Sequence, residues 1–206
     1  MKVKTILFDL GGVFVSDAKI NYKNHLCDFS SVLAFAGVSQ KDADKVMEKH
    51  WPKLKLGEES LDDFWKDFQS LVKKGVDVKD VINMYWDRIL MDEDVFEFAR
   101  KLKKKYHLMA LANESKEGMD FKNKKFKLLE LFEKVYCSAY LNMAKPNKDI
   151  YEAVINDSKL DLSTTVFVDN QIANVNMAES LGIKSILFKN LEQLKEELTE
   201  LGISTE

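Results

Sequence analysis

The sequence predicts an α/β fold in which an all-helical domain is inserted into a doubly wound parallel sheet. Two observations lead to this expectation. After Asp92, short apolar and β-branched runs alternate with helical segments, which is the pattern of strand and helix units in a parallel sheet. Between about Ile20 and Leu90 the apolar residues recur with helical period, and no strand stands out. We therefore expect residues 1–15 and 91–206 to form a Rossmann-like core and residues 16–90 to form a helical cap.

The first strand is expected over residues 3–8, because this short apolar run stops at Asp9 and a pair of glycines. The clearest helix of the insertion starts behind Ser60 as its N-cap and stops at Gly75. Its apolar residues fall on one face, at the spacing of a helix: Phe64, Trp65, Phe68, Leu71 and Val72. Further cap helices are expected at about residues 22–36, 41–51 and 78–90, with Pro52 ending the second of these.

The second half of the chain is expected to alternate regularly between the two kinds of element. Strands are expected at residues 108–112, 134–138, 165–168 and 185–188. Helices are expected from Asp92 to Lys105, after the strand at 108–112 through Leu128 to Phe132, and at 149–156, 172–181 and 191–201. Because the first strand has the same buried character, we expect it to join this sheet, so the helical segment interrupts the core.

Composition and charge exclude several classes of function. Lys and Arg total 31 against 34 Asp and Glu, a net charge of -3, so no basic excess indicates nucleic-acid binding. The apolar run at the N-terminus stops at Asp9, too early for a signal sequence or a membrane span. Cys27 and Cys137 match no metal-binding spacing and are expected to be reduced, mostly buried thiols. We expect a cytoplasmic protein.

Polar side chains follow the predicted strands at the edge where a parallel sheet binds its ligands. Asp9 follows the first strand and Asp169 follows a later one, so the two carboxylates are expected to lie close together. Such a pair repels unless a cation intervenes, and a hard divalent cation suits oxygen ligands. Lys145, after a third strand, adds a charge suited to a phosphate oxygen or to Asp9. This combination indicates phosphoryl transfer.

Four segments, in order, resemble the motifs of the haloacid dehalogenase-like superfamily. Residues 6–14, Ile-Leu-Phe-Asp-Leu-Gly-Gly-Val-Phe, look like the first motif, and residues 108–115, Leu-Met-Ala-Leu-Ala-Asn-Glu-Ser, resemble the second. Residues 143–151, with Lys145-Pro146, are similar to the third. Residues 166–174, from Val166 through Asp169-Asn170 to Asn174, resemble the fourth. The helical insertion, with Gly57 before the Ser60 helix, is similar to the C1 cap of that family.

The resemblance implies a phosphohydrolase that removes phosphate from a small phosphorylated metabolite, sugar phosphates included. It implies that Asp9 attacks phosphorus to form an aspartyl-phosphate that water then hydrolyses. Asp9, the main-chain carbonyl of Gly11, and Asp169 would hold Mg²⁺. Lys145 would stabilise the nucleophile and the transferring oxygens, and N–H groups around Asn113 would bind the phosphate.

The chain departs from the family pattern at the general acid. Phosphatases of the family place a second aspartate two residues after the nucleophile, and this chain has Gly11 there. The main-chain metal ligand is kept, but the acid is lost. Positioned acid–base catalysis contributes about 10²- to 10⁴-fold, so we expect a lower rate unless another group substitutes. Asp17 and His25, early in the insertion, are weak candidates for that role.

Two further departures concern phosphate and metal binding. Ala112 stands where the family has a Ser or Thr, which removes one hydrogen bond to a charged group, worth roughly 1.5–3 kcal/mol. The side-chain amide of Asn113 is expected to compensate in part. Asn170 stands where a second acidic residue is common, so Asp169 remains as ligand in a less negative site.

These departures leave two alternatives to a phosphatase. The first is a binding or regulatory protein that keeps the fold and has lost catalysis. The absence of both the acid at position 11 and a hydroxyl at position 112 suggests it. The second is a 2-haloacid dehalogenase, which needs no metal and also lacks the second aspartate. Asp169 argues against the dehalogenase, because its carboxylate would repel a carboxylate substrate. A subgroup of sugar-phosphate phosphatases has the same glycine at this position, so the phosphatase remains the favoured prediction.

Overall fold

A computed structural model describes residues 2–15 and 29–204. Its centre is a five-stranded sheet in which all four neighbouring pairs are parallel, in the order β3-β2-β1-β4-β5. The strands are β1 (Thr5–Phe8), β2 (His107–Ala112), β3 (Lys134–Cys137), β4 (Thr165–Asp169) and β5 (Lys184–Leu187). The α/β class and the parallel sheet predicted from the sequence are confirmed.

Strand order reverses at β1, which determines where a ligand site can form. The chain goes from β1 outward to β2 and β3, then returns to the other side of β1 for β4 and β5. Phe8 of β1 is in register with Val168 of β4, so Asp9 and Asp169 follow side by side at the carboxyl ends. Ligands of open parallel sheets bind at such a switch point.

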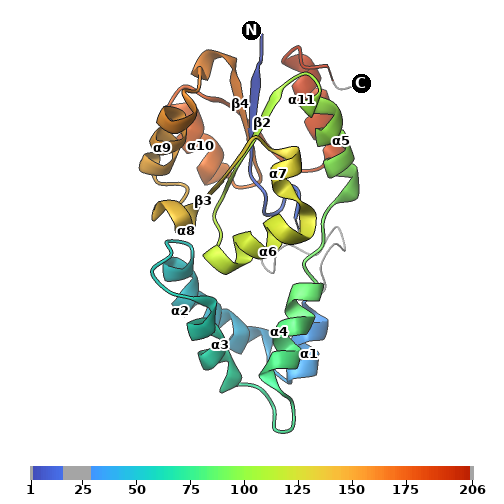
Figure 1. The fold of residues 1–206 in the computed structure, drawn as a ribbon, viewed down its shortest axis with the longest axis vertical. Helices are drawn as coiled ribbons and strands as arrows, with labels where there is room; N and C mark the ends of the chain where they lie inside the picture. Colours follow the sequence, from blue (N-terminus) through green and yellow to red (C-terminus); the bar gives the residue numbers. More distant parts are fainter. Residues whose placement is uncertain (1, 16–28, 205–206) are drawn as a thin grey trace.

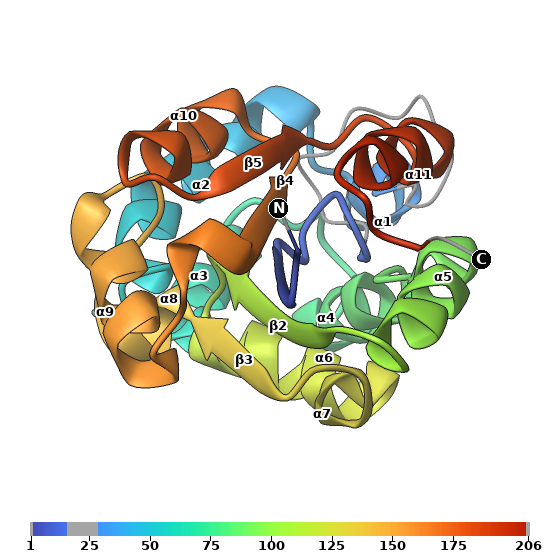
Figure 2. The same cartoon turned by 90° about the horizontal axis from the view of Figure 1, so that it is seen from above.

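Helices cover both faces of the sheet, as the two views of the molecule show (Figures 1 and 2). One face carries α5 (Glu93–Lys103), α6 (Lys116–Phe126), α7 (Leu128–Leu131) and α11 (Leu191–Glu200). The other carries α9 (Lys148–Ser158) and α10 (Ile172–Ser180). Side chains alternate between the faces: Ile6 and Phe8 pack with the first group, whereas Leu7 packs with the second.

Four helices form a layer beyond the carboxyl ends of the strands (Figure 1). They are α1 (Ser30–Ala36), α2 (Gln40–Leu54), α3 (Leu61–Gln69) and α4 (Val78–Asp87). Ser60 and Asp63 form a capping box that starts α3. The apolar face of α3, formed by Phe64, Trp65 and Phe68, is buried among these helices. This layer agrees with the expected helical cap, and the division at residues 16–90 stays a prediction.

The cap touches the core through rings and polar contacts. The Trp86 and Phe121 rings lie with centroids 4.4 Å apart. Asn142 donates a hydrogen bond of 2.8 Å from its amide nitrogen to the Leu56 carbonyl oxygen. Gly57 approaches the core so closely that a β-carbon there would lie 2.3 Å from the Ala139 carbonyl oxygen. The cap therefore rests directly on the segment that follows β3.

Two expectations about helix ends are wrong. Pro52 does not end α2, which runs to Leu54. Proline removes one hydrogen bond, but the bond from Lys55 N–H to the Trp51 carbonyl remains, and burial of Leu54 stabilises the last turn. The α3 helix stops at Gln69 rather than at Gly75, and turns connect the two residues.

The helical stretch before β3 is also interrupted. Lys127 has a φ of 52° and separates α6 from α7. The α7 helix has four residues and ends at Leu131, one residue before the expected end at Phe132. After β3 the chain forms α8 (Ser138–Leu141), a short helix that the sequence did not predict. Leu162–Thr164 forms a 3-10 turn labelled η2 before β4. Within the described ranges, no helix has both the length and the apolar character needed to cross a membrane.

Candidate active site

Three predicted site residues meet at the carboxyl ends of β1 and β4. Asp9 is fixed by its own main chain, whose N–H donates to the Val168 carbonyl of the neighbouring strand at 2.8 Å. Asp169 is the last residue of β4. Lys145 reaches them from the loop between α8 and α9. The parallel register places the two acids, and the loop after β3 supplies the cation.

The Lys145 ammonium bridges the two carboxylates. Its Nζ lies 2.9 Å from Asp9 Oδ1 and 2.7 Å from Asp169 Oδ2. All three residues are buried, with exposed fractions of 6% for Asp9, 2% for Lys145 and 0% for Asp169. Lys145 Nζ also lies 5.5 Å from the centre of the Phe167 ring. Two carboxylates and one ammonium leave this group with a net negative charge, hidden from water.

Burial has a direct effect on protonation at this group. Loss of water raises the pKa of Asp9 to about 7, against the Lys145 charge that lowers it, and the Asp169 charge adds to the rise. Burial also opposes the charge on Lys145, but the two carboxylates outweigh it and raise the pKa of its ammonium. The cluster is short of positive charge, which is the condition in which a further cation binds favourably.

Asp169 is held in place by a residue that the sequence did not single out. Asn174, on the first turn of α10, donates from Nδ2 to both Asp169 oxygens at 3.0 Å. The Gln171 main-chain N–H donates to Asp169 Oδ1 at 2.8 Å. Behind them, the buried Tyr151 hydroxyl donates to the Asn174 carbonyl at 3.1 Å. The available signal was the asparagine five residues after Asp169, at the start of the following helix.

Asn113 lies at the expected strand end, and its side chain binds the main chain of Lys145. Its Nδ2 donates to the Lys145 carbonyl at 2.8 Å, and its Oδ1 accepts from the Lys145 N–H at 2.9 Å. This reciprocal pair fixes the main chain of Lys145 beside β2. This pairing engages both Nδ2 and Oδ1 of the amide that is expected to compensate in part for the hydroxyl missing at Ala112. Ala112 itself is buried as the last residue of β2.

The oxygen atoms near this cluster suit a hard divalent cation. Asn170 Oδ1 is buried and has no hydrogen-bond partner among the residues that the structure describes. Such an atom is unfavourable unless it is satisfied by a ligand or water. In the described ranges, no three His, Cys, Asp or Glu side chains gather as metal ligands. A metal here would need main-chain or amide oxygens besides Asp9 and Asp169, and Gly11 and Asn170 offer such oxygens.

The structure does not test every residue predicted for the site. Gly11 lies two residues beyond Asp9, in the turn that leads to Val15. Asp17 and His25, named as replacements for the general acid, lie outside the described residues. Their role as a replacement acid therefore stays a prediction.

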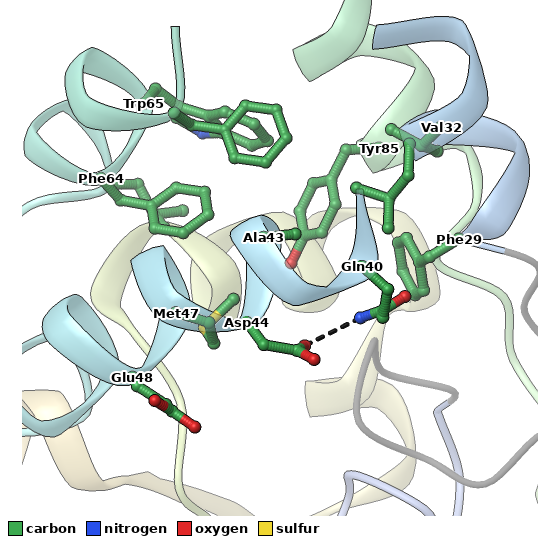
Figure 3. Close-up of a pocket in the computed structure, with 13 residues that line it drawn as sticks. Phe29, Val32, Gln40, Ala43, Asp44, Met47, Glu48, Phe64, Trp65 and Tyr85 are labelled. Atoms are coloured by element: carbon green, nitrogen blue, oxygen red, sulfur yellow. Dashed lines mark hydrogen bonds between the residues drawn. The ribbon is translucent and has the colours of Figure 1, made fainter. Parts of the chain in front are cut away.

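A cavity of about 250 Å³ lies elsewhere, among the helices of the cap, and is lined by side chains of α1 to α4 (Figure 3). Aromatic rings, including Phe29, Phe64, Trp65 and Tyr85, form its wall, and Gln40 and Asp44 are hydrogen-bonded to each other at its edge (Figure 3). It includes no predicted site residue, so we place the site at the charged cluster.

Comparison with known sequences shows which family the chain resembles. A family model described as haloacid dehalogenase-like hydrolase matches residues 3–182. D-ribitol-5-phosphate phosphatase from Bacteroides thetaiotaomicron is 26% identical over 210 residues, covering 96% of this chain and 97% of the relative. Flavin mononucleotide hydrolase 1 from Arabidopsis thaliana is 28% identical over 80 residues, covering 39% of this chain and 33% of that protein.

Solved structures share the fold. A predicted HAD-like family hydrolase from Porphyromonas gingivalis has a TM-score of 0.76 and 24% identity, covering 99% of this chain and 100% of its own. A HAD family enzyme from B. thetaiotaomicron, in complex with magnesium and inorganic phosphate, has a TM-score of 0.74 and 22% identity, over 93% and 98% of the two chains. L-2-haloacid dehalogenase from Xanthobacter autotrophicus has a TM-score of 0.60 and 16% identity, over 98% and 84%.

Proposed function

The chain belongs to the haloacid dehalogenase-like hydrolases, and within this family we propose that it is a magnesium-dependent phosphatase of small phosphorylated metabolites. The observation that carries the proposal is the buried cluster of Asp9, Lys145 and Asp169 at the switch point of the sheet. Similarity to D-ribitol-5-phosphate phosphatase over nearly the whole chain favours sugar-alcohol phosphates as the substrate class.

In this proposal Asp9 is the nucleophile. A carboxylate oxygen of Asp9 forms a bond to phosphorus while the bond from phosphorus to the alcohol oxygen breaks, which leaves an aspartyl-phosphate and an alkoxide. Water then attacks phosphorus, releases inorganic phosphate and restores the carboxylate. Asp9 is suited to this role because β1 and its hydrogen bond to β4 fix its position.

Lys145 stabilises the charges that meet during transfer. In the structure its ammonium keeps Asp9 and Asp169 close together despite their repulsion. When a phosphate enters, the same ammonium can donate to a phosphate oxygen while Asn113 holds its main chain in place. Main-chain N–H groups around Ala112 and Asn113 are proposed to bind the phosphate, and no hydroxyl of residue 112 assists them.

We propose that Asp9, the Gly11 carbonyl and Asp169 hold Mg²⁺, and Asn170 follows Asp169 directly in the chain. The buried negative charge and the unpartnered Asn170 oxygen support this assignment. A bound Mg²⁺ supplies a Lewis acid for the phosphate oxygens. Asn174 donates to both oxygens of Asp169 and so restricts rotation of the carboxylate. The carboxylate is therefore oriented before a ligand binds.

The missing acid affects the release of the first product, the alcohol. Gly11 has no side chain that can give a proton to the leaving alkoxide. The alkoxide must therefore take its proton from water or from another group of the protein. We expect turnover about 10²- to 10⁴-fold below that of an enzyme with a positioned acid.

A phosphate-release screen tests the proposal. The wild-type protein is assayed on D-ribitol 5-phosphate, other sugar phosphates, nucleotides and acyl phosphates, with Mg²⁺ and with a chelator. We expect release that requires Mg²⁺ and is lost in Asp9→Asn. Asp149→Asn, a change at an exposed residue of α9, is the control and should remain active. Hydrolysis that survives in Asp9→Asn would exclude this nucleophile.

The two alternatives give different results in the same assays. Halide release from 2-haloacids without metal would indicate the dehalogenase, in which ¹⁸O from labelled water enters the Asp9 carboxylate. In the phosphatase, labelled oxygen enters the released phosphate. Mg²⁺ binding without turnover of any substrate would indicate a protein that keeps the fold and has lost catalysis. The buried Asp169 charge argues against the dehalogenase, because it would repel a haloacid carboxylate.

A further inference from the structure

A buried ion pair lies where the cap meets the core. Glu114 follows Asn113 just beyond the end of β2, and Lys122 lies on α6. The Lys122 ammonium donates to Glu114 Oε2, and the two side chains are only 5% and 14% exposed. In many proteins a buried ion pair is no more stabilising than an apolar pair of similar size. Its presence at this place therefore indicates a role besides stability.

The Glu114 carboxylate is fixed by its neighbours. Its main-chain N–H donates to Ser138 Oγ at 3.0 Å. Its Oε1 accepts from the Ser115 main-chain N–H at 2.9 Å and from Ser115 Oγ at 3.3 Å. Gly118 leaves the space that this oxygen occupies, since a β-carbon there would lie 2.4 Å from Oε1. The carboxylate is therefore oriented before a ligand binds.

This carboxylate can accept a further hydrogen bond. An ionised carboxylate has about four positions at which it can accept a donor. Among the described residues, three donors use them: the Ser115 main-chain N–H, the Ser115 hydroxyl and the Lys122 ammonium. A fourth donor, such as a hydroxyl group, can still be accepted.

The ion pair lines a small cavity between the cap and the core. The cavity has a volume of about 30 Å³, which is enough for one water molecule or one hydroxyl group. Glu114 and Lys122 line it from the core, and Trp51, Tyr85 and Trp86 are among the residues that line it from the cap. Apolar walls with a few fixed polar groups are typical of sites that recognise small molecules.

The position of Glu114 in the chain connects this cavity with the charged cluster. Main-chain N–H groups around Ala112 and Asn113 are proposed to bind the phosphate, and Glu114 is the next residue. Asn113 also holds the main chain of Lys145, whose ammonium reaches Asp9. Neighbouring residues of a chain lie about 3.8 Å apart. Glu114 is therefore placed to meet the alcohol part of a substrate whose phosphate lies at the strand end.

We propose that Glu114 and Lys122 form a subsite that binds a hydroxyl group of the substrate's alcohol part. Glu114 accepts the hydrogen bond, and Lys122 supplies the counter-charge. An alkyl group in the same place leaves the buried carboxylate without that hydrogen bond, and sites built to bind a hydroxyl reject such analogues strongly. The subsite therefore selects polyol phosphates over alkyl phosphates. This inference rests on the proposed phosphatase function, because it names the substrate class of the same site.

Two substrates with five carbons test the subsite: D-ribitol 5-phosphate, and n-pentyl phosphate, which has no hydroxyl groups. The ratio of their kcat/KM values for phosphate release measures the preference for hydroxyl groups. Wild type is compared with Glu114→Leu/Lys122→Met, in which apolar side chains replace the ion pair. The control is Lys127→Met/Glu130→Leu, the same change in a pair whose side chains are 71% and 74% exposed.

We expect the ratio to fall by about 10- to 100-fold in Glu114→Leu/Lys122→Met, because one hydrogen bond to a charged group is lost. The control should keep the wild-type ratio. Partial unfolding of a variant lowers both kcat/KM values together and leaves their ratio unchanged. An unchanged ratio in Glu114→Leu/Lys122→Met would therefore assign the ion pair to stability alone and overturn the proposal. Wild-type protein without a preference for D-ribitol 5-phosphate would also overturn it.

Binding to Asp9→Asn separates the subsite from the proposed function. Titration calorimetry with the same two compounds and Mg²⁺ should show tighter binding of D-ribitol 5-phosphate, and adding Glu114→Leu/Lys122→Met should remove this difference. That result, with no phosphate release by the wild type, would contradict the proposed function and support the subsite. Phosphate release with no difference between the two compounds in kcat/KM or in binding would do the reverse. Absence of both release and a binding difference would overturn both.

Discussion

At the scale of single residues, the site depends on Lys145. Its ammonium is buried between two carboxylates, so removing it leaves two negative charges with no counter-charge. Breaking a buried ion pair in this way is far more destabilising than losing an exposed one. The group that we propose to stabilise the transferring phosphate is therefore also expected to stabilise the fold.

Lys145→Met is expected to lower the free energy of unfolding by about 3–5 kcal/mol in the absence of metal, because it leaves Asp9 and Asp169 buried and unpaired. Urea unfolding measures this change. Lys148→Met is the control, since the Lys148 side chain is 55% exposed and pairs with Glu152 of its own helix. Equal stability of the two variants would show that the bridge contributes nothing.

Asn174→Ala is expected to weaken Mg²⁺ binding by about 10- to 100-fold, because Asp169 loses two hydrogen bonds that orient its carboxylate. The Mg²⁺ concentration that gives half-maximal phosphate release measures the effect. Asn176→Ala, an exposed asparagine of the same helix, should leave that concentration unchanged. The same Mg²⁺ dependence in both variants would remove Asn174 from the site.

The sequence predicted which charged residues meet, because strand ends of a parallel sheet converge and Asp9, Lys145 and Asp169 each follow a predicted strand. It did not predict how neighbouring amides are used. The engagement of Asn113 with the Lys145 main chain depends on a loop conformation after β3 that carries no periodic signal. Asn174 was missed for a similar reason, since an amide on the first turn of a helix is usually exposed.

At the scale of elements, one glycine determines the contact between α8 and the loop of residues 55–60, which we call the cap loop. Gly57 has a φ of 68°, and a β-carbon would overlap the Ala139 carbonyl oxygen. The oxygen belongs to the main chain of the core, so it cannot turn away as a side chain would. Any larger residue must move the loop that carries Gly57 or α8.

Gly57→Ala is expected to destabilise the protein more than Gly75→Ala does. Both glycines have positive φ, so each alanine brings conformational strain of roughly 1–2 kcal/mol. Gly75 has no atom within 4 Å of the added carbon, whereas Gly57 has the main-chain oxygen at 2.3 Å. Urea unfolding of the two variants isolates the contact, and equal losses would mean that the loop does not rest on α8.

Helix ends show where sequence reasoning about elements fails. The period of apolar residues identified α3, because this helix buries one face. The ends depend on tertiary contacts that this period does not contain. Burial of Leu54 carries α2 past Pro52, and Lys127 adopts the left-handed conformation that separates α6 from α7.

At the scale of the whole molecule, the helical layer and the charged cluster form one arrangement. The cap lies over the carboxyl edge of the sheet, where Asp9 and Asp169 are buried (Figure 1). Such a layer can exclude water during transfer and choose the substrate. The order of four motif segments predicted this arrangement from the sequence, since an insertion after the first strand must lie near that strand's carboxyl end.

The most direct test of the account is the capture of the intermediate on Asp9. The protein is mixed with a substrate found in the screen, quenched in acid and reduced with borohydride, which converts an aspartyl-phosphate to homoserine. Mass spectrometry of the N-terminal peptide should then find homoserine at position 9, dependent on Mg²⁺ and absent from Asp9→Asn. Phosphate release from the same sample with Asp9 unmodified throughout would contradict the assignment of this residue as the nucleophile.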